Sequence, residues 1–417
     1  MADFTSRSRV LCALEHREPD RVPVDFASTR SSGINALAYG KLIKYLKLPL
    51  DNVVFDMRQL LSEVDDQVRR LMGGDIIQLH RLSPSMGVRL NQGYRPETLM
   101  DGSAARVPAD FHYENLPDGS AVIRDAGGTV LFKRASGGLY FDDMYHPLED
   151  AESPDDIDAN INLPGIGAEE LDYLAKRAKN LYEKTPYAII GTTSVSIFER
   201  GAKDFGYENF LMQQVSDPDL IEYYLDKLSS AYIAMLDKYL DAVGDYIQVI
   251  QLHDDYGTQN SLLISPNVFK KTMKPFHSKI HGFIKSKKPH LKIFFHCCGA
   301  IASLIPDLID SGIDILNPVQ ISAGGMDPRF LKKEYGKSLV FWGGACSSQT
   351  TMSFKSADAV REEAREMIGI FAPGGGFVFC QDHNIQPTIP PENIAALYET
   401  ARDAGIYHIQ QSLAKEN

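Results

Sequence analysis

Eight short apolar runs recur along the chain, most of them followed by a helix-like segment, and this alternation constrains the fold strongly. Each run has the length of a strand, is enriched in β-branched and aromatic residues and ends in polar residues. Runs that are apolar throughout are typical of parallel strands buried on both faces. The runs are Arg21–Phe26, Asp75–His80, Tyr187–Gly191, Asp245–Leu252, Leu291–His296, Ile313–Asn317, Ser338–Trp342 and Gly376–Cys380.

Capping residues mark the helices between these runs. A Ser-Asp-Pro sequence opens a segment over residues 216–244, and a Ser-Pro pair opens another over 265–287. Later helices are expected over 356–371 and 391–405. Eight strands that alternate with helices are the number that closes a (β/α)8 barrel, so the predicted fold class is α/β. A doubly wound open sheet is the alternative, because strand count alone does not exclude it.

The stretch between the second and third runs, about 100 residues, is too long for one helix. It contains Asp-Gly and Gly-Gly turn signals between alternating segments, which predict a β-hairpin insertion over about residues 85–150. Its aromatics Tyr140, Phe141 and Tyr145 either cover substrate at the mouth of the barrel or pack the insertion's own small core. We expect barrel and insertion to form a single domain over residues 1–417.

Composition excludes several function classes. The 43 Lys and Arg residues against 55 Asp and Glu residues give a formal charge of −12, without the basic clusters that nucleic-acid binding requires. The apolar runs are far shorter than a membrane span, and the first residues lack the layout of a signal peptide. We therefore expect a cytoplasmic protein with no nucleic-acid or membrane partner.

The ends of the predicted strands carry an unusual density of reactive side chains. Chemistry in a (β/α)8 barrel is located at the carboxyl ends of the strands. We expect substrate contacts there and in the insertion, and proton transfer at the fourth and eighth strands. The predicted substrate-binding residues are His80, His253, Tyr256, Asn317, Gln320 and Tyr140, and the predicted catalytic residues are His383, Asp254 and Asp255.

His296 and Cys298 share one face of the fifth strand, because residues two apart in a strand point the same way. Cys380, at the end of the eighth strand, is the candidate third ligand. Three nitrogen and sulfur ligands with one open position are the pattern of catalytic zinc. The alternative is that both cysteines are small buried residues and His296 is hydrogen-bonded at its strand end. The remaining cysteines, including Cys297, are expected to pack in the core.

The acidic pair Asp254-Asp255 has two interpretations. One of these carboxylates, or His383, could complete the zinc coordination. The pair could equally accept hydrogen bonds from strand-end amides or from a substrate amine. For His383 we predict an acid–base role rather than metal ligation.

Several motifs together carry a family resemblance over nearly the whole chain. The sequence resembles the uroporphyrinogen decarboxylase superfamily, and within it the corrinoid-dependent methyltransferase branch. The motifs are EPDRVPVDF (18–26), DDYGTQ (254–259), FHCCG (295–299), IPDLIDSGIDILNPVQ (305–320), FWGG (341–344), APGGGFVF (372–379), HNIQP (383–387) and PPENIAALYE (390–399).

The resemblance implies a (β/α)8 barrel in which His296, Cys298 and Cys380 bind Zn²⁺. In that branch, zinc activates a thiol that takes a methyl group from a methylated corrinoid protein. The Arg-Gln-Ala-Gly-Arg motif of true decarboxylases is absent, and Thr29–Gly33 occupies its place with only Arg30 as a basic contact. No Asp-x-His-x-x-Gly cobalamin motif occurs in the chain, so cobalamin must arrive on a partner protein or free.

The sequence therefore predicts a zinc-dependent methyltransferase that moves a methyl group between a corrinoid protein (methylcobalamin) and a small molecule, either a thiol or a methyl ether that is demethylated. The resemblance also suggests a homodimer. One alternative is a decarboxylase-like lyase without zinc, in which His383 and the acidic pair handle protons. Another is a non-catalytic barrel that binds a small ligand.

Overall fold

A parallel sheet of seven strands forms most of a barrel, in the order β15-β14-β13-β12-β11-β10-β3. The computed structural model describes residues 4–407. Every neighbouring pair in this sheet is parallel, and each strand coincides with one of the predicted apolar runs to within one residue at its carboxyl end or lies inside it. The strands are β3 (Ile76–Leu79), β10 (Ala188–Thr192), β11 (Val249–His253), β12 (Lys292–His296), β13 (Ile315–Asn317), β14 (Val340–Trp342) and β15 (Phe377–Val378).

The first predicted run, Arg21–Phe26, lies between the two edges of this sheet. The Asp25 amide donates to the Phe379 carbonyl (2.9 Å), and the Asp75 amide donates to the Val24 carbonyl (2.8 Å). The run forms isolated bridges, parallel from Val24 to Phe379 and antiparallel from Arg21 to Ile406, and not a regular strand. The reason is chemical: Pro23 has no amide hydrogen, and the Val24 amide donates to the Asp75 side chain instead of to a carbonyl. The predicted α/β barrel fold is confirmed.

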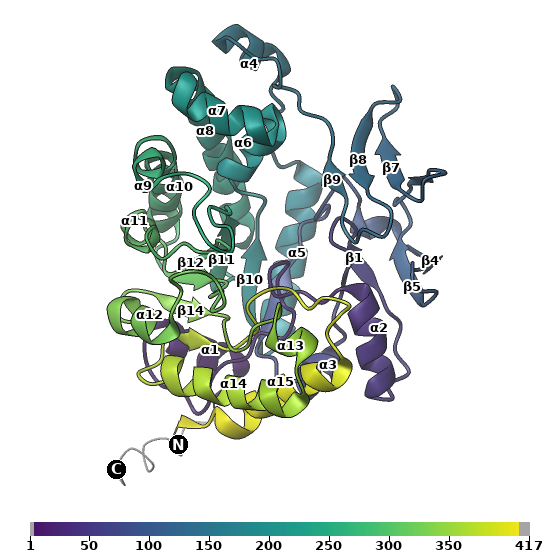
Figure 1. The fold of residues 1–417 in the computed structure, drawn as a ribbon, viewed down its shortest axis with the longest axis vertical. Coiled ribbons are helices and arrows are strands. Elements are labelled where there is room, and N and C mark those ends of the chain that lie inside the picture. The colour runs from purple at the N-terminus through teal and green to yellow at the C-terminus, as the bar shows by residue number, and fades with distance from the viewer. Residues whose placement is uncertain (1–3, 408–417) are drawn as a thin grey trace.

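Helices follow the strands around the outside of the sheet, as Figure 1 shows. The four predicted segments are matched closely by α8, by α9 with α10, by α14 and by α15. The helices are α1 (Ser6–Leu14), α2 (Ala36–Tyr45), α3 (Asp66–Leu71), α4 (Pro154–Asn160), α5 (Ala168–Lys184), α6 (Phe198–Phe205), α7 (Tyr207–Ser216), α8 (Pro218–Val243), α9 (Pro266–Val268), α10 (Lys274–Lys287), α11 (Ile305–Asp310), α12 (Pro328–Tyr335), α13 (Thr351–Phe354), α14 (Ala357–Phe371) and α15 (Pro391–Ala404). Within the described chain, no helix combines the length and apolar character that crossing a membrane requires.

The caps of these helices are the predicted ones. The Asp217 side chain accepts from the Leu220 amide at the start of α8, with Pro218 in the first turn. The Ser356 hydroxyl accepts from the Ala359 amide at the start of α14. Each cap satisfies an amide that has no partner within the helix, so the helix start is fixed by local chemistry.

The inside of the barrel is filled by alternate residues of the strands. Ile76, Ile190, Val249, Phe294 and Trp342 belong to one buried cluster, which α1 closes from below with Val10 and Leu14. Because residues two apart share a face, the next inward positions above Val249 and Phe294 are polar: Gln251 and His253 on β11, and His296 on β12. The core therefore ends where the candidate site begins.

The predicted insertion is present and consists of two small antiparallel sheets beyond β3, which lie to one side of the barrel (Figure 1). It packs against the loop that carries β1 (Val54–Asp56) and β2 (Leu61–Ser62) and shares a buried cluster with it. The strands of the insertion are β4 (Tyr94–Thr98), β5 (Ala104–Pro108), β6 (Glu114–Asn115), β7 (Ala121–Arg124), β8 (Val130–Arg134) and β9 (Asp142–Asp143).

Candidate functional site

The carboxyl ends of β11, β12 and β13 place three polar side chains in register. His253 pairs with His296 across β11 and β12, and His296 pairs with Asn317 across β12 and β13. The chain leaves β11 through Asp254 and Asp255 and leaves β12 through Cys297 and Cys298. Neighbouring parallel strands thus deliver imidazole, carboxylate and thiol groups to the same end of the barrel.

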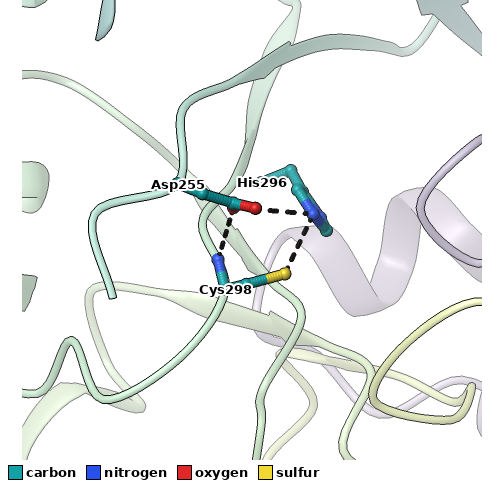
Figure 2. Close-up of side chains that lie close together, drawn as sticks. All are labelled: Asp255, His296 and Cys298. Carbon is teal, nitrogen blue, oxygen red and sulfur yellow. Dashed lines mark hydrogen bonds and ion pairs between the residues drawn. The ribbon is translucent and has the colours of Figure 1, made fainter. Parts of the chain in front are cut away.

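Asp255, His296 and Cys298 form a compact group whose candidate ligand atoms all lie within 4.8 Å of one another. Figure 2 shows the three side chains pointing toward one another. The Cys298 sulfur lies 3.2 Å from His296 Nε2, and the Asp255 carboxylate lies 3.8 Å from the same nitrogen. The Cys298 amide also donates to the Asp255 carboxylate, at 2.7 Å. One nitrogen, one sulfur and one oxygen atom therefore converge on a single point.

Asn317 orients the His296 ring. The Asn317 amide nitrogen donates to the Trp342 carbonyl (2.8 Å), which leaves its side-chain oxygen to accept from His296 Nδ1 (2.7 Å). With the proton held on Nδ1, Nε2 presents its lone pair to Cys298 and Asp255. An imidazole fixed in this way through its other nitrogen is the usual arrangement of a metal-binding histidine.

Burial and the Asp255 carboxylate together raise the pKa of the Cys298 thiol well above its usual range. Without a nearby cation the thiol is therefore protonated at neutral pH. A divalent cation among these three groups would reverse that balance, because coordination deprotonates a thiol.

A cavity of about 210 Å³ lies beside this group and is called the inner cavity here. Asp255, His296, His253, His383 and Gln251 are among its lining residues. An outer cavity of about 780 Å³ shares Asp255 and His253 with it and extends to the insertion and to α6. The site is thus reached through a wide mouth that narrows toward the barrel axis.

His253 pairs with Glu199, a residue that the sequence did not single out. His253 Nε2 lies 3.3 Å from the Glu199 carboxylate, and both side chains line the two cavities. Burial acts to raise the pKa of Glu199, but the His253 imidazole and other cationic neighbours outweigh it and hold the pKa at about 2. Burial likewise opposes the protonation of His253, yet Glu199 raises the pKa of His253 overall. Glu199 follows no apolar run, so strand-end reasoning had no signal for it.

Asp254 occupies a structural position and not the predicted catalytic one. It is fully buried and accepts from the amides of Ile197, Phe198 and Glu199 at 2.8, 2.9 and 2.8 Å, where α6 begins. Burial raises the pKa of Asp254 to about 7, and the amide donors act in the opposite direction. This is the alternative of hydrogen bonding to amides; Asp255 also accepts from one amide, that of Cys298, but in addition lies beside His296.

Two predicted substrate contacts are buried away from both cavities. Tyr256 is 0% exposed, and its hydroxyl lies 2.8 Å from His277 Nε2. His80 is 2% exposed and lies 2.5 Å from the Glu63 carboxylate. Each polar group therefore has an internal partner, and neither residue lines the inner or outer cavity. Strand position alone did not distinguish such partnered groups from groups that face a ligand.

Asn317 and Gln320 support the site instead of lining it. Asn317 is 1% exposed and holds His296, as described above. Gln320 accepts from the Gly299 amide at 2.9 Å and so fixes the turn that follows Cys298. Both were predicted as substrate contacts, and their observed neighbours are protein groups.

The insertion aromatics take different places. Phe141 is buried in the insertion's own cluster, 6.1 Å from the Phe111 ring centroid, whereas half of Tyr145 is exposed. The Tyr140 hydroxyl accepts from Gln386 at 2.6 Å and ties the insertion to the loop after β15. For Phe141 the packing interpretation is the correct one, and none of the three lines the inner cavity.

Cys380 does not join the metal-candidate group formed among the described residues. It is fully buried in the inner barrel cluster with Trp342 and Val378. Burial, with a smaller contribution from the Asp25 carboxylate, raises the pKa of its thiol well above the usual range. In the structure, the Asp255 carboxylate and not the Cys380 thiol lies beside His296 and Cys298.

His383 lines the inner cavity, as its predicted acid–base role requires. Burial, together with the neighbouring His296, lowers the pKa of His383. The ring is therefore neutral at neutral pH and can accept a proton. The other cysteines pack as predicted, with Cys12, Cys297 and Cys346 all buried.

Known proteins resemble this chain in fold and in sequence. A methyltransferase from Methanosarcina mazei shares the fold over 96% of this chain and 99% of its own, with a TM-score of 0.60 and 18% identity. A uroporphyrinogen decarboxylase from Chloroherpeton thalassium is 23% identical over 276 residues, 64% of this chain and 72% of that protein. The corresponding protein of a Synechocystis species is 25% identical over 250 residues, 59% of this chain and 65% of that protein.

The pattern of the uroporphyrinogen decarboxylase family matches residues 137–404. This range contains β10 to β15 and the whole group of Asp255, His296 and Cys298. Because the match extends over more than half of its length, the chain belongs to the uroporphyrinogen decarboxylase family.

Proposed function

We propose that the protein is a zinc-dependent methyltransferase that moves a methyl group between a corrinoid protein and a small molecule, either a thiol or a methylated compound such as a methyl ether. The observation that carries the proposal is the His296 ring, which Asn317 turns so that Nε2 faces Cys298 and Asp255. The fold likeness to the Methanosarcina methyltransferase and the family membership agree with it.

The donor set fits zinc. Imidazole nitrogen and thiolate sulfur favour zinc over magnesium or calcium, and a carboxylate oxygen is also a common zinc ligand. Three protein ligands leave a fourth position open, and two of the three residues line the inner cavity. A small molecule in that cavity can therefore reach the open position.

Zinc, when bound, would supply Lewis acidity that lowers the pKa of a substrate thiol or polarises the oxygen of a methyl ether. The protein's own contribution is positional. Asn317 holds the His296 ring, and the Asp255 carboxylate accepts from the Cys298 amide, so the three ligand atoms stay together. Glu199 raises the pKa of His253 and so favours its protonated form beside them, and His383 lines the same cavity with a neutral ring that can accept a proton.

The corrinoid is proposed to arrive on a partner protein, since the chain has no cobalamin-binding motif of its own. Cobalt must approach the methyl group to bonding distance. The outer cavity of about 780 Å³ is the wider of the two and opens toward α6 and the insertion, so we place the approach there.

A decarboxylase without zinc is the second candidate, because the relatives named above carry that name. Such an enzyme must hold carboxylate groups of its substrate with cationic side chains. Arg30 and Arg58 line the inner cavity, but Arg30 lies 2.5 Å from Asp56 and Arg58 lies 2.6 Å from Asp143. Both guanidinium groups are thus already neutralised by protein carboxylates, which favours the methyltransferase.

Elemental analysis of anaerobically purified protein tests the proposal. We expect about one zinc per chain in the wild type and none in Cys298→Ala. Cys297→Ala is the matched control, since the neighbouring thiol is buried in the core on the opposite face. The zinc-loaded protein should then demethylate methylcobalamin with thiols, or methylate reduced cobalamin with methyl ethers. Protein kept reduced that contains no zinc, and loses no activity in Cys298→Ala, would favour the lyase or the non-catalytic barrel.

A further inference from the structure

The inner cavity is lined only by polar and charged side chains among the described residues. Arginine, serine, glutamine, threonine, glutamate, aspartate, histidine and asparagine side chains form its wall, with no aliphatic or phenyl group. Small-molecule sites are mostly apolar with a few polar anchors and measure roughly 300–1,000 Å³. At about 210 Å³, this cavity is small and hydrophilic, so it suits a small hydrophilic ligand.

The charges of this wall compensate one another. Besides the two arginines, which are paired with Asp56 and Asp143, His253 is paired with Glu199 at 3.3 Å. The lowered pKa of His383 leaves that ring neutral. Asp255 and His296 belong to the proposed zinc group, where two anionic ligands balance a divalent cation. The wall therefore offers no unpaired charge for an ionic ligand.

Part of the hydrogen-bonding capacity that remains on this wall consists of buried acceptors. The Gln251 side chain is 6% exposed; its nitrogen donates to the Ser31 hydroxyl at 2.9 Å, and its oxygen has no partner among the described residues. The Gln59 side-chain oxygen is likewise buried without one. Leaving such an acceptor unpaired in a buried site costs free energy, so a donor is expected from the ligand.

Two threonines on the same wall add to this pattern. The Thr192 hydroxyl donates to the Leu79 carbonyl at 2.9 Å, and the Thr193 hydroxyl donates to the Gln251 carbonyl at 2.7 Å. Each hydroxyl has one hydrogen, so toward the cavity both oxygens can only accept. The wall thus presents the two unpartnered glutamine oxygens to a ligand's donors, and the two threonine oxygens can also accept; that of Thr193 already accepts from the Val195 amide at 3.3 Å.

We infer that the small-molecule substrate is neutral and carries at least two hydroxyl groups, with Gln251 and Gln59 accepting hydrogen bonds from it. A methyl ether of a small polyol has this chemistry, whereas an anionic thiol and an aromatic methyl ether do not. The inference rests on the proposed function for the role of this ligand as substrate and for the charge balance at Asp255, whereas the hydrogen bonds to Gln251 and Gln59 do not involve zinc.

Binding to the full-length protein tests the inference, by saturation-transfer NMR and calorimetry with four probes. They are glycerol monomethyl ether, which has two hydroxyl groups, methyl propyl ether, which has none, methoxyacetate, which is anionic, and methoxybenzene, which is aromatic. We expect glycerol monomethyl ether to bind at least tenfold more tightly than the other three. Tighter binding of methoxyacetate or methoxybenzene, or equal binding of methyl propyl ether, would overturn the inference.

Variants locate the contact. Gln251→Leu should weaken the binding of glycerol monomethyl ether about tenfold, the factor expected for one hydrogen bond. Gln214→Leu is the matched control: Gln214 is also buried with an unpartnered oxygen, but it lies on α7 and lines neither cavity. If Gln251→Leu melts at a lower temperature than the wild type, the affinity of Gln59→Leu for glycerol monomethyl ether provides a second measurement. Unchanged affinity in both cavity variants would overturn the assignment.

The design separates this inference from the proposed function. Cys298→Ala removes a proposed zinc ligand but neither Gln251 nor Gln59, so it should still bind glycerol monomethyl ether more tightly than the other three probes. Binding without zinc or methyl transfer would support the cavity assignment and contradict the methyltransferase. Zinc-dependent methyl transfer with an anionic thiol as the sole small-molecule ligand would do the reverse.

Discussion

The ends of β12 and β15 look alike in sequence and differ in the structure. Each strand delivers a cysteine to the carboxyl end of the barrel, Cys298 after β12 and Cys380 after β15. The first thiol lies beside an imidazole and a carboxylate at the wall of a cavity, whereas the second is enclosed with Trp342 and Val378 in the apolar interior. Strand alternation predicts the face to which a side chain points, but it does not predict how far along the barrel axis that side chain lies.

Removing each thiol in turn tests most directly whether Cys298 and Cys380 have different roles. Cys298→Ala should abolish stoichiometric zinc binding and lower methyl transfer more than about 100-fold, because it removes a ligand itself. Cys380→Ala should retain about one zinc per chain, since Asp255 and not Cys380 lies with His296 and Cys298 in the candidate group. Zinc content by elemental analysis checks both. Loss of zinc in Cys380→Ala would mean that the thiol moves into the site when metal binds.

Asn317→Leu tests the support of the β12 group without touching a ligand. The variant removes the acceptor that holds the proton on His296 Nδ1, so the ring loses its fixed orientation. Loss of such a partner typically lowers metal affinity about 10- to 100-fold. Competition with a chromophoric chelator measures the affinity, and Cys297→Ala serves as the control. An affinity equal to that of the wild type would show that His296 needs no orienting partner.

Asp254 and Asp255 are adjacent in sequence, and substituting each in turn should separate a structural role from a metal-binding role. Asp254→Asn should lower the free energy of unfolding by about 1 to 2 kcal/mol, because an amide at the start of α6 loses its carboxylate acceptor. Zinc binding should persist in that variant. Asp255→Asn should weaken zinc binding and leave the melting temperature nearly unchanged. Chemical denaturation and zinc titration of both variants check this. Weaker zinc binding in Asp254→Asn, with a loss of stability in Asp255→Asn, would mean that the two residues have each other's role.

The smallest expected effect concerns pH and the Glu199–His253 pair. The folded pKa of Glu199, about 2, lies below its ordinary value of 4.5, so the ionised carboxylate stabilises the fold above pH 4.5. That contribution is lost as the pH falls from 4.5 toward 2. Because the side chain is partly exposed, we expect a stability difference of about 1 kcal/mol between wild type and Glu199→Gln near neutral pH. If the denaturation midpoints of the wild type and Glu199→Gln did not converge at acidic pH, the ion pair between Glu199 and His253 would be contradicted.

Much of the fold was predictable because its signals are local. The apolar runs, the Asp217 and Ser356 caps and the turn signals of the insertion each depend on residues close in sequence, and each is confirmed. The family was likewise predictable from motifs such as FHCCG at 295–299 and is confirmed by the match over 137–404. The first strand was predicted too regular, because the effect of Pro23 on its hydrogen bonds depends on Asp75.

The sequence by itself determined the barrel, its insertion and the placement of His296 and Cys298, two residues apart, at the carboxyl end of β12, because periodicity and alternation follow from covalent geometry. Only the tertiary structure decided how the strand-end groups divide. It assigned Asp254 to the start of α6, Asn317 to His296 and Cys380 to the core, and it added Glu199 to the site. Partners such as these join residues on different elements, and no local pattern encodes the distances between them.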